Sequence, residues 1–566
     1  MEIAISYKKF TDSMKTFTIL LFIGSNKNQN AYIYYGFLSP LNYFFMNSSR
    51  RDFIRTTGLG TLGMGLLPAI EPIHHLFDNN FISGLPRFSP ESQGVSSKAI
   101  RHFIEAANAS GLGWHSFMLL RHGNVVAEGW WKPFEPSFTH TLYSLSKSFT
   151  STAIGLLVKD GKLNIEDKVI SFFPEDSPAA PDDNLKQMKV KHLLTMNTGH
   201  GEDTLPKLRA SADAWTKTFL AQKVDFEPGS HFLYNTGATY MLGAIVYKIT
   251  GQTLYSFLTP RLFQPLNIKG YDWETSPQGL NTAGYGLRVK TEDIAKFGQL
   301  YLQKGKWNGK EILTETWVKE ATSYQTKSQE GNGDWSQGYG YQFWRCKPGF
   351  YRGDGAYGQF CIVMPEQDAV LAVTSESWDM QKSMTTIWEN LLPAIQAGAM
   401  PEDKTELLEL KKDLKNLVLP VPKAAVHSTA SAKYNGKKIR LEANDFIAAT
   451  TQFNFSKEGC SWTTITAKGA TTIRFGWENW VLNKETALYI FPLPGRLHVP
   501  SKIAGTATWI NENTLQLNAR FTEAMHGDKI TCTFNDDKVM ISFMNSVSEN
   551  SKTDLEKRKP LTGTIA

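Results

Sequence analysis

A segment in the first third of the chain combines a serine, a lysine and a helical pattern. Ser144 and Lys147 lie three residues apart, and apolar residues then recur at three- and four-residue steps as far as Gly161, a typical helix terminator. Side chains at positions i and i+3 share one face of a helix, so the hydroxyl and the amine can meet. The segment therefore predicts that the chain folds around a helix with a candidate nucleophile at its N-terminus.

This arrangement suits nucleophilic catalysis. A lysine amine can take the hydroxyl proton of Ser144 if burial lowers its pKa from the ordinary value of about 10.4. The helix start supplies unpaired N–H groups and a positive dipole end, and the N–H of Ser144 is then half of an oxyanion hole. The alternative is that Ser144 only caps the helix, since serine is common there and S-x-x-K also occurs at Ser6–Lys9.

Flanking residues strengthen the catalytic interpretation. The segment His140–Ser151 resembles the S-x-x-K segment of the serine β-lactamase and penicillin-binding-protein superfamily, especially esterase-like and amidase-like members related to class C β-lactamases and 6-aminohexanoate-dimer hydrolase. Ser89–Val95 resembles the start of that domain, and His192–Gly199 resembles its hLLtMtSG segment. The resemblance runs from about Pro86 to Met400. It implies an α/β (α+β) β-lactamase/transpeptidase-like fold, with an antiparallel sheet flanked by helices and a helical subdomain.

A second motif follows at Tyr234-Asn235-Thr236. The superfamily has Tyr-x-Asn here, and its tyrosine shuttles protons with the lysine, so the resemblance assigns that role to Tyr234. A tyrosine must lose about three pKa units to act as a base near neutrality, and a cationic lysine can supply much of this. Thr236, a predicted substrate contact, replaces the Asn of β-lactam-active members, which weakens β-lactam recognition. The alternative is an ordinary tyrosine packed under a helix start.

The third motif is a glycine-rich strand end. By the resemblance, Gly353-Asp354-Gly355 occupies the position of the Lys-Thr-Gly strand, and the N–H of Ala356 completes the oxyanion hole with Ser144. Glycines allow a substrate to approach a strand closely, so substrate contacts are predicted at Asp354, Gly355 and Gly358. The positive charge of the lysine is absent, and Asp354 is expected to repel an anion or attract an amine. The alternative is a plain tight hairpin.

Composition limits the other functions. At 566 residues, with 41% hydrophobic and 20% charged residues, the chain predicts a soluble protein of two domains. The net charge of +6 includes no long Lys/Arg run, so no nucleic-acid partner is expected. The four cysteines form no C-x-x-C pair and no H-E-x-x-H occurs, so neither a metal nor another cofactor is expected. Two cysteines in each domain permit one disulfide per domain, or buried free thiols.

The N-terminal region predicts export. Arg50 and Arg51 lie in a twin-arginine pattern that is followed by a glycine- and leucine-rich run, as in a Tat signal. Because such signals lie near the true N-terminus, translation is expected to start at Met46. The protein is then periplasmic or secreted and contacts the membrane only transiently, during export.

The C-terminal part reads as a separate domain without a catalytic motif. Short alternating strands, such as 472–475, 487–491 and 514–521, indicate a small all-β domain, either a barrel or a sandwich. The expected divisions are an N-terminal extension (1–45), the Tat signal (46–75), the hydrolase domain (85–400), a helix and linker (401–423), the β-domain (424–548) and a flexible tail (549–566).

Together these features predict an exported serine hydrolase that cleaves a small ester, amide or peptide through an acyl-enzyme on Ser144, with Lys147 and Tyr234 moving the proton. The chain has no G-x-S-x-G elbow, so an α/β-hydrolase is excluded. Two alternatives stay open: a β-lactamase or D,D-peptidase, and a non-catalytic ligand-binding protein on the same scaffold. The sequence indicates no oligomeric state.

Overall fold

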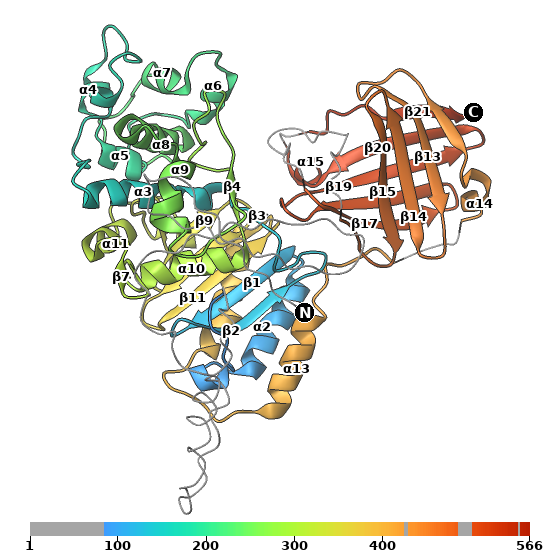
Figure 1. The fold of residues 1–566 in the computed structure, drawn as a ribbon, viewed down its shortest axis with the longest axis horizontal. Coiled ribbons are helices and arrows are strands. Elements are labelled where there is room, and N and C mark those ends of the chain that lie inside the picture. The colour runs from blue at the N-terminus through green and yellow to red at the C-terminus, as the bar shows by residue number, and fades with distance from the viewer. Residues whose placement is uncertain (1–83, 424–427, 485–500, 553–554) are drawn as a thin grey trace, which may run out of the picture. The chain divides into compact units, whose positions relative to one another are not determined.

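The computed structural model describes residues 84–423, 428–484, 501–552 and 555–566 (Figure 1). The N-terminal extension, the export signal and the strand expected at 487–491 lie outside these residues. The fold is mixed α/β, with an antiparallel sheet covered by helices and a C-terminal all-β region, as the sequence predicts.

The central sheet has six antiparallel strands in the order β2-β1-β11-β10-β9-β8. Its strands are β1 (Trp114–Arg121), β2 (Asn124–Trp130), β8 (Trp344–Arg345), β9 (Tyr351–Gly355), β10 (Gln359–Met364) and β11 (Ala369–Ser375). Both faces are buried. Phe117 and Leu119 of β1 join one hydrophobic cluster, whereas Met118 and Leu120 join the other, as the two-residue period of a strand requires.

Helices cover both faces of this sheet (Figure 1). One face packs against α3 (Ser146–Lys159) and α10 (Thr291–Leu302), and the other against α2 (Ser97–Ser110) and α13 (Lys404–Lys415). Every residue of α3 from Ser146 to Leu157 is buried, so this helix forms part of the core rather than the surface. The ring of Phe149 stacks on Phe297 of α10, with 4.0 Å between centroids.

The helical subdomain follows α3. It contains α4 (Asp183–Gln187), α5 (Val190–Leu194), α6 (Leu205–Ala210), α7 (Trp215–Leu220), α8 (Thr236–Thr250) and α9 (Leu254–Leu258). Shorter elements of the chain are β3 (His140–Thr141), β4 (Asp272–Trp273), β5 (Leu287–Val289), β6 (Lys306–Trp307), β7 (Lys310–Glu311), α11 (Glu315–Thr322), α12 (Met380–Thr386), α14 (Ala430–Tyr434) and α15 (Ser546–Asn550). α8 begins where the side chain of Asn235 accepts from the N–H groups of Gly237 and Ala238.

The aromatic sequence of residues 338–344 also predicts a strand, and this prediction is wrong except at its end. Gly338 and Gln342 have φ of 99° and 64°, which interrupts an extended backbone. The N–H of Tyr341 donates to Ala321 and that of Gln342 to Leu194, so these donors reach helices rather than a neighbouring strand. Only Trp344 and Arg345 form a strand, β8, which pairs with β9.

The C-terminal sheet has ten strands in the order β15-β14-β13-β12-β21-β20-β19-β18-β17-β16, and a parallel pairing of β15 with β17 closes it on itself. Its strands are β12 (Lys438–Leu441), β13 (Ala448–Phe455), β14 (Gly459–Thr466), β15 (Gly469–Trp477), β16 (Val481–Asn483), β17 (Ile503–Asn511), β18 (Thr514–Phe521), β19 (Gly527–Asn535), β20 (Lys538–Asn545) and β21 (Leu561–Ile565). Alternate residues, such as Leu515 and Leu517, fill its core.

The expectation of a flexible tail over 549–566 is wrong for its last part. β21 lies between β12 and β20 and pairs with both. Leu561 and Gly563 are buried in the β-domain, whereas Thr562 and Thr564 are more exposed. Buried and exposed residues therefore alternate as in a strand, but the polar composition of the segment made this alternation hard to recognise in the sequence.

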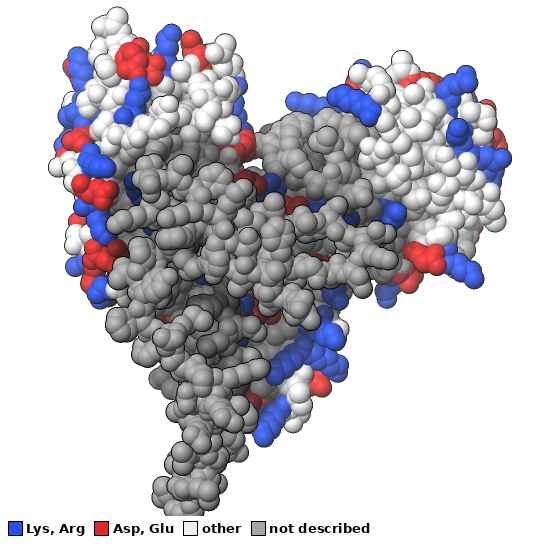
Figure 2. Space-filling model, in the orientation of Figure 1, with Lys and Arg blue, Asp and Glu red and all other residues white. Residues whose placement is uncertain are grey.

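Other surface and core features bear on function. All four cysteines are buried free thiols, so neither domain contains the possible disulfide. None of the helices in the described part of the chain combines the length and apolar character needed to cross a bilayer. On the face in Figure 2, Lys and Arg are interspersed with Asp and Glu over the described surface, so the net charge does not gather into one basic track there.

Candidate active site

Ser144 lies in η2 (Tyr143–Leu145), a single turn directly before α3. The helix therefore begins two residues later than the serine, although Ser144 still precedes it as predicted. Tyr143 has a φ of 48°, in the left-handed region that a residue with a side chain rarely adopts. The backbone is thus strained immediately before the candidate nucleophile, which is common at functional sites.

Lys147 is almost completely buried, with 1% of its surface exposed, and its amine points at the serine. Its Nζ lies 3.1 Å from Ser144 Oγ, 2.8 Å from the carbonyl oxygen of Gly284 and 3.4 Å from Thr236 Oγ1. A Cβ on Gly284 would lie 3.3 Å from this Nζ and 2.7 Å from Thr236 Cγ2, so a side chain there would crowd the lysine. The sequence analysis did not identify Gly284 as the acceptor that orients Lys147.

Tyr234 lies just before α8, and its ring is next to the lysine. Lys147 Nζ is 4.9 Å from the ring centroid, and the ring stacks on Trp344 at 5.4 Å. Burial raises the pKa of Tyr234, while hydrogen bonds with Ser144 and Trp344 act in the opposite direction without overcoming it. The expectation that its pKa would be lowered is therefore wrong. Tyr234 is a neutral phenol near neutrality, which suits it to donate a proton rather than to start the reaction as a base.

Hydrogen bonds at the start of α8 hold the backbone of Thr236 so that its side chain lies beside Lys147. Its N–H donates to Asp203 Oδ1 at 2.9 Å, while Asn235, the residue before it, caps α8 and also accepts from Thr204. The hydroxyl of Thr236 consequently faces Lys147. The structure thus brings together Ser144, Lys147, Tyr234 and Thr236, and the role of Thr236 as a substrate contact stays a prediction.

The glycines of the third motif let β9 lie directly against the nucleophile turn. A Cβ on Gly353 would lie 2.2 Å from Leu145 Cδ1 and 2.9 Å from Ser148 Oγ, and a Cβ on Gly355 would lie 2.1 Å from the carbonyl oxygen of Leu142. No side chain fits at either position without displacing η2 or α3. This packing explains why glycine stands at position 353, where the superfamily has lysine.

Ala356 begins the turn between β9 and β10. Its carbonyl oxygen accepts from Gln359 Nε2 at 3.0 Å, and its N–H has no acceptor among the described residues. Because Gly355 contacts Leu142, the turn lies close to Ser144, as an oxyanion hole built from both N–H groups requires. Gly358 has a φ of 88°, and a Cβ there would lie 2.3 Å from Ser375 Oγ, so the turn itself requires glycine.

Asp354 is buried and paired. Its carboxylate accepts from Arg352 Nε at 2.8 Å, and the side chain of Arg352 is completely buried. Burial raises the pKa of Asp354, and Arg352 opposes this. The sequence analysis missed Arg352, although residues i and i+2 of a strand share a face. Because this guanidinium balances the carboxylate, the predicted attraction of a substrate amine lacks a free charge to act on.

No three His, Cys, Asp or Glu side chains gather closely enough to hold a metal ion within the parts of the chain that the structure describes. A surface hollow elsewhere is lined by residues such as Val158, Leu163 and Trp317. It lies at the opposite end of α3 from Ser144 and contains none of the predicted site residues. Of the predicted site residues, Lys147 and Tyr234 are the acid–base groups that lie next to Ser144.

Comparisons with known proteins give a family match and more distant relatives. The β-lactamase family model matches residues 97–395, more than half of the chain. Over 288 residues the chain is 25% identical to 6-aminohexanoate-dimer hydrolase of Paenarthrobacter ureafaciens, covering 46% of this chain and 72% of that protein. It is 23% identical over 239 residues to a β-lactamase of Escherichia coli K12, covering 38% of this chain and 61% of that one.

A solved structure is also similar over most of the chain. The octameric penicillin-binding protein homologue of Pyrococcus abyssi matches with a TM-score of 0.42 and 15% identity, covering 82% of this chain and 99% of that one.

Proposed function

The chain belongs to the β-lactamase family, and from that premise we propose that it is an exported serine hydrolase that cleaves an ester or amide through an acyl-enzyme on Ser144. The observation that carries this proposal is the 3.1 Å contact between Lys147 Nζ and Ser144 Oγ. The carbonyl of Gly284 and the hydroxyl of Thr236 hold the amine in that position. A buried amine aimed at a serine hydroxyl is the arrangement that activates such a nucleophile.

Acylation follows from these positions. Ser144 Oγ forms a bond to the substrate carbonyl carbon while its proton passes to the neutral amine of Lys147. The carbonyl π electrons move to oxygen, and the N–H groups of Ser144 and Ala356 hold the oxyanion, each lowering the barrier by about 3–4 kcal/mol. When the bond to the leaving group breaks, that group takes a proton from Tyr234 or Lys147. Tyr234 is suited to this step because its raised pKa keeps it protonated.

Deacylation reverses the roles. A water molecule gives a proton to the same pair and bonds to the acyl carbon, and the bond to Ser144 Oγ breaks as the serine recovers its proton. The products are the carboxylic acid, the leaving alcohol or amine, and the enzyme in its starting protonation state.

The third motif favours esters or amides over β-lactams. With Gly353 packed on Leu145 and Ser148, no cationic side chain stands there to pair with a substrate carboxylate. Thr236 also replaces the asparagine that recognises β-lactam side chains in the superfamily. A β-lactamase or D,D-peptidase is the second candidate, supported by the similarity to the Escherichia coli β-lactamase. Turnover of nitrocefin, or acylation by labelled penicillin, at rates comparable with ester cleavage would favour this second candidate.

Export through the Tat pathway is part of the proposal and rests on the twin-arginine pattern at Arg50 and Arg51. The mature protein is then periplasmic or secreted. Intact-mass analysis of the native protein tests this, because a mature chain that retains residues before Met46 would contradict both the start site and the signal.

The central experiment labels the nucleophile. Purified protein is treated with a fluorophosphonate probe and assayed with p-nitrophenyl acetate, beside Ser144→Ala and Ser151→Ala. Ser151 is the matched control, because it lies on the same helix and its buried hydroxyl has no hydrogen-bond partner in the described residues. We expect labelling at Ser144 and loss of activity only in Ser144→Ala. Labelling that survives in Ser144→Ala, or no labelling of the wild type, would instead support a different serine or a binding protein.

A further inference from the structure

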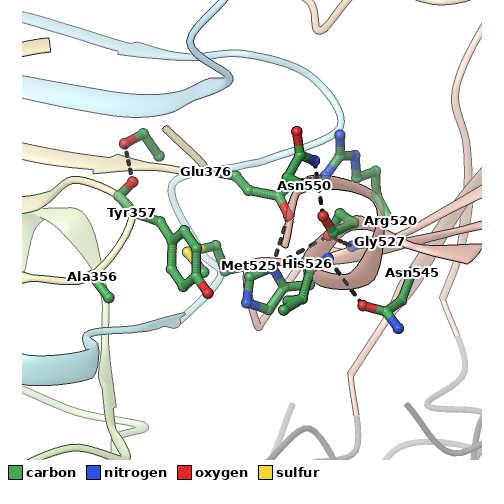
Figure 3. A network of polar contacts seen from close by, with 12 residues as sticks. Ala356, Tyr357, Glu376, Arg520, Met525, His526, Gly527, Asn545 and Asn550 are labelled. Carbon is green, nitrogen blue, oxygen red and sulfur yellow. Dashed lines mark hydrogen bonds and ion pairs between the residues drawn. The ribbon is translucent and has the colours of Figure 1, made fainter. Parts of the chain in front are cut away.

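One loop of the β-domain reaches the nucleophile turn. Residues 81–566 form one compact unit, and the loop of residues 522–526, between β18 and β19, contacts the hydrolase domain within it. The imidazole of His526, 1% exposed, lies between two hydrolase side chains. Its Nε2 is 2.7 Å from the hydroxyl of Tyr143. Its Nδ1 is 2.7 Å from Glu376 Oε1 (Figure 3).

The charges around this imidazole fix its orientation. Burial disfavours the charge on Glu376, but Arg520 and His526 outweigh burial and lower the pKa of Glu376 to about 2. Arg520 also pairs with the other carboxylate oxygen. Because an ionised carboxylate only accepts hydrogen bonds, Nδ1 of His526 donates to Glu376. This bond fixes the ring so that Nε2 faces the Tyr143 hydroxyl, and Glu376 therefore orients the imidazole that holds Tyr143.

The residues held in this way flank the two N–H groups of the oxyanion hole. Tyr143 precedes Ser144, and Tyr357 follows Ala356. The ring of Tyr357 lies 5.0 Å from that of His526 and 5.5 Å from that of Tyr143, both edge to face. Tyr143 and Tyr357 also have left-handed φ values of 48° and 65°. Such backbone conformations persist only where surrounding contacts hold them, and here the shared contact is His526.

The same loop reaches the oxyanion turn by a second route. Gln359 Nε2 lies 3.0 Å from Met525 Sδ and donates to the carbonyl oxygens of Ala356 at 3.0 Å and Ser375 at 2.7 Å. Met525 therefore packs on the side chain that fixes the peptide of Ala356. Both candidate oxyanion residues thus have a neighbour that contacts the β-domain.

We propose that the 522–526 loop is part of the active site and that His526 is a positioning residue, which acts through Tyr143 and Tyr357 on the N–H groups of Ser144 and Ala356. This inference rests on the proposed function. It gives the β-domain a part in the hydrolytic step, and it predicts that the hydrolase domain alone has a misaligned oxyanion hole.

The test is a mutant cycle with p-nitrophenyl esters in the full chain. The variants are His526→Ala, His526→Gln, Tyr143→Phe and the double variant His526→Ala with Tyr143→Phe. We expect kcat to fall about ten- to a hundredfold in His526→Ala with KM within about threefold, since displaced oxyanion donors weaken only the transition state. Glutamine, which carries both a donor and an acceptor, restores most of kcat. The double variant is no slower than the slower single variant.

Controls separate positioning from folding. Val539→Ala creates a cavity in the β-domain core at the end of the β19–β20 hairpin remote from His526, and should leave kcat unchanged. Tyr143→Phe removes the same contact without altering the β-domain, so it tests the inference even if His526→Ala fails to fold. Unchanged kcat in Tyr143→Phe and His526→Ala, losses that add in the double variant, or an equal loss in Val539→Ala would each overturn the positioning role.

Labelling of Ser144 by the fluorophosphonate probe distinguishes failure of this inference from failure of the proposed function. If Ser144 of the wild type is labelled but the cycle shows no effect, only the role of His526 fails. If Ser144 is not labelled at all, the proposed function fails and this inference fails with it.

Discussion

The amine of Lys147 lies 3.1 Å from the hydroxyl oxygen of Ser144, although only 1% of this residue is exposed. We expect Lys147→Met, which retains the volume of the side chain, to lower kcat/KM by about 10²–10⁴-fold because the proton acceptor is lost. The control is Lys159→Met in the last turn of the same helix, where the amine bonds the carbonyls of Glu311 and Ile312. More than a tenth of the activity remaining in Lys147→Met would contradict the assigned role.

Gly353 is predicted to be irreplaceable. In Gly353→Ala the new Cβ must displace Leu145 or Ser148, so we expect a loss of about 1–3 kcal/mol in the free energy of unfolding and a fall in kcat as η2 moves. Urea denaturation and ester hydrolysis measure the two effects. The control is Gly398→Ala, where a Cβ would meet no atom within 4 Å. Equal stability of these two variants would show that β9 does not press on the nucleophile helix.

The Arg352 and Asp354 pair should contribute to stability more than to substrate selection. Asp354→Asn leaves the guanidinium of Arg352 buried without its counter-charge, which typically costs about 3–5 kcal/mol. We expect a large drop in the urea midpoint of unfolding. Activity towards amine-bearing esters should fall by the same factor as activity towards neutral esters. Glu409→Gln, which breaks the exposed pair with Lys412, should change stability by less than about 1 kcal/mol. A selective loss of cationic substrates in Asp354→Asn would restore the original hypothesis of an amine site.

Acid should destabilise the fold before its carboxylates titrate. Burial lowers the pKa of His140, His192 and His200 from 6.5 to about 4, and lowers that of His115 well below 6.5. Between pH 6.5 and 4 the unfolded chain therefore binds more protons than the folded one, so stability falls as the pH decreases through this window. Asp293 and Asp354 act in the opposite sense, because burial raises the pKa of both carboxyls, that of Asp293 to about 6, but they are two groups against four.

Urea denaturation at about pH 7 and about pH 5 measures this dependence. His200→Gln should reduce it, whereas His102→Gln, at a position with 70% of the side chain exposed, should leave it unchanged. Stability that is constant or higher at the lower pH would show that the buried histidines do not control acid unfolding.

Local patterns were sufficient for much of the fold and part of the site. The three-residue spacing of Ser144 and Lys147 was enough to predict that their side chains meet at the start of a helix, although Ser144 lies in the turn before α3. The alternation of β18 likewise follows from neighbouring residues. The same reasoning failed at β21, where polar residues disguise a strand, and at residues 338–344, where left-handed residues interrupt an apparently suitable strand.

The direction of the Tyr234 pKa could not be read from the sequence, because it depends on burial as well as on the nearby lysine. Reasoning from the motif counted the cation and left out the loss of water, which dominates in the fold. Arg352 was missed for a related reason. Its pairing with Asp354 matters only because both side chains are buried together.

The sequence by itself determined that a serine and a lysine stand three residues apart at the start of a helix, and that an all-β domain follows near the C-terminus. Those properties depend on residues a few positions apart, so periodicity and motif spacing suffice, whereas the antiparallel hydrolase scaffold was implied by the resemblance to a known family. Only the tertiary structure decided that Gly284 orients the lysine, that Gly353 is enclosed by α3, and that His526 lies against Tyr143. The hydrogen bond from Lys147 to Gly284 joins residues 137 positions apart, and that between Tyr143 and His526 joins residues 383 positions apart. Such contacts arise from strand order and domain packing, which no local pattern encodes.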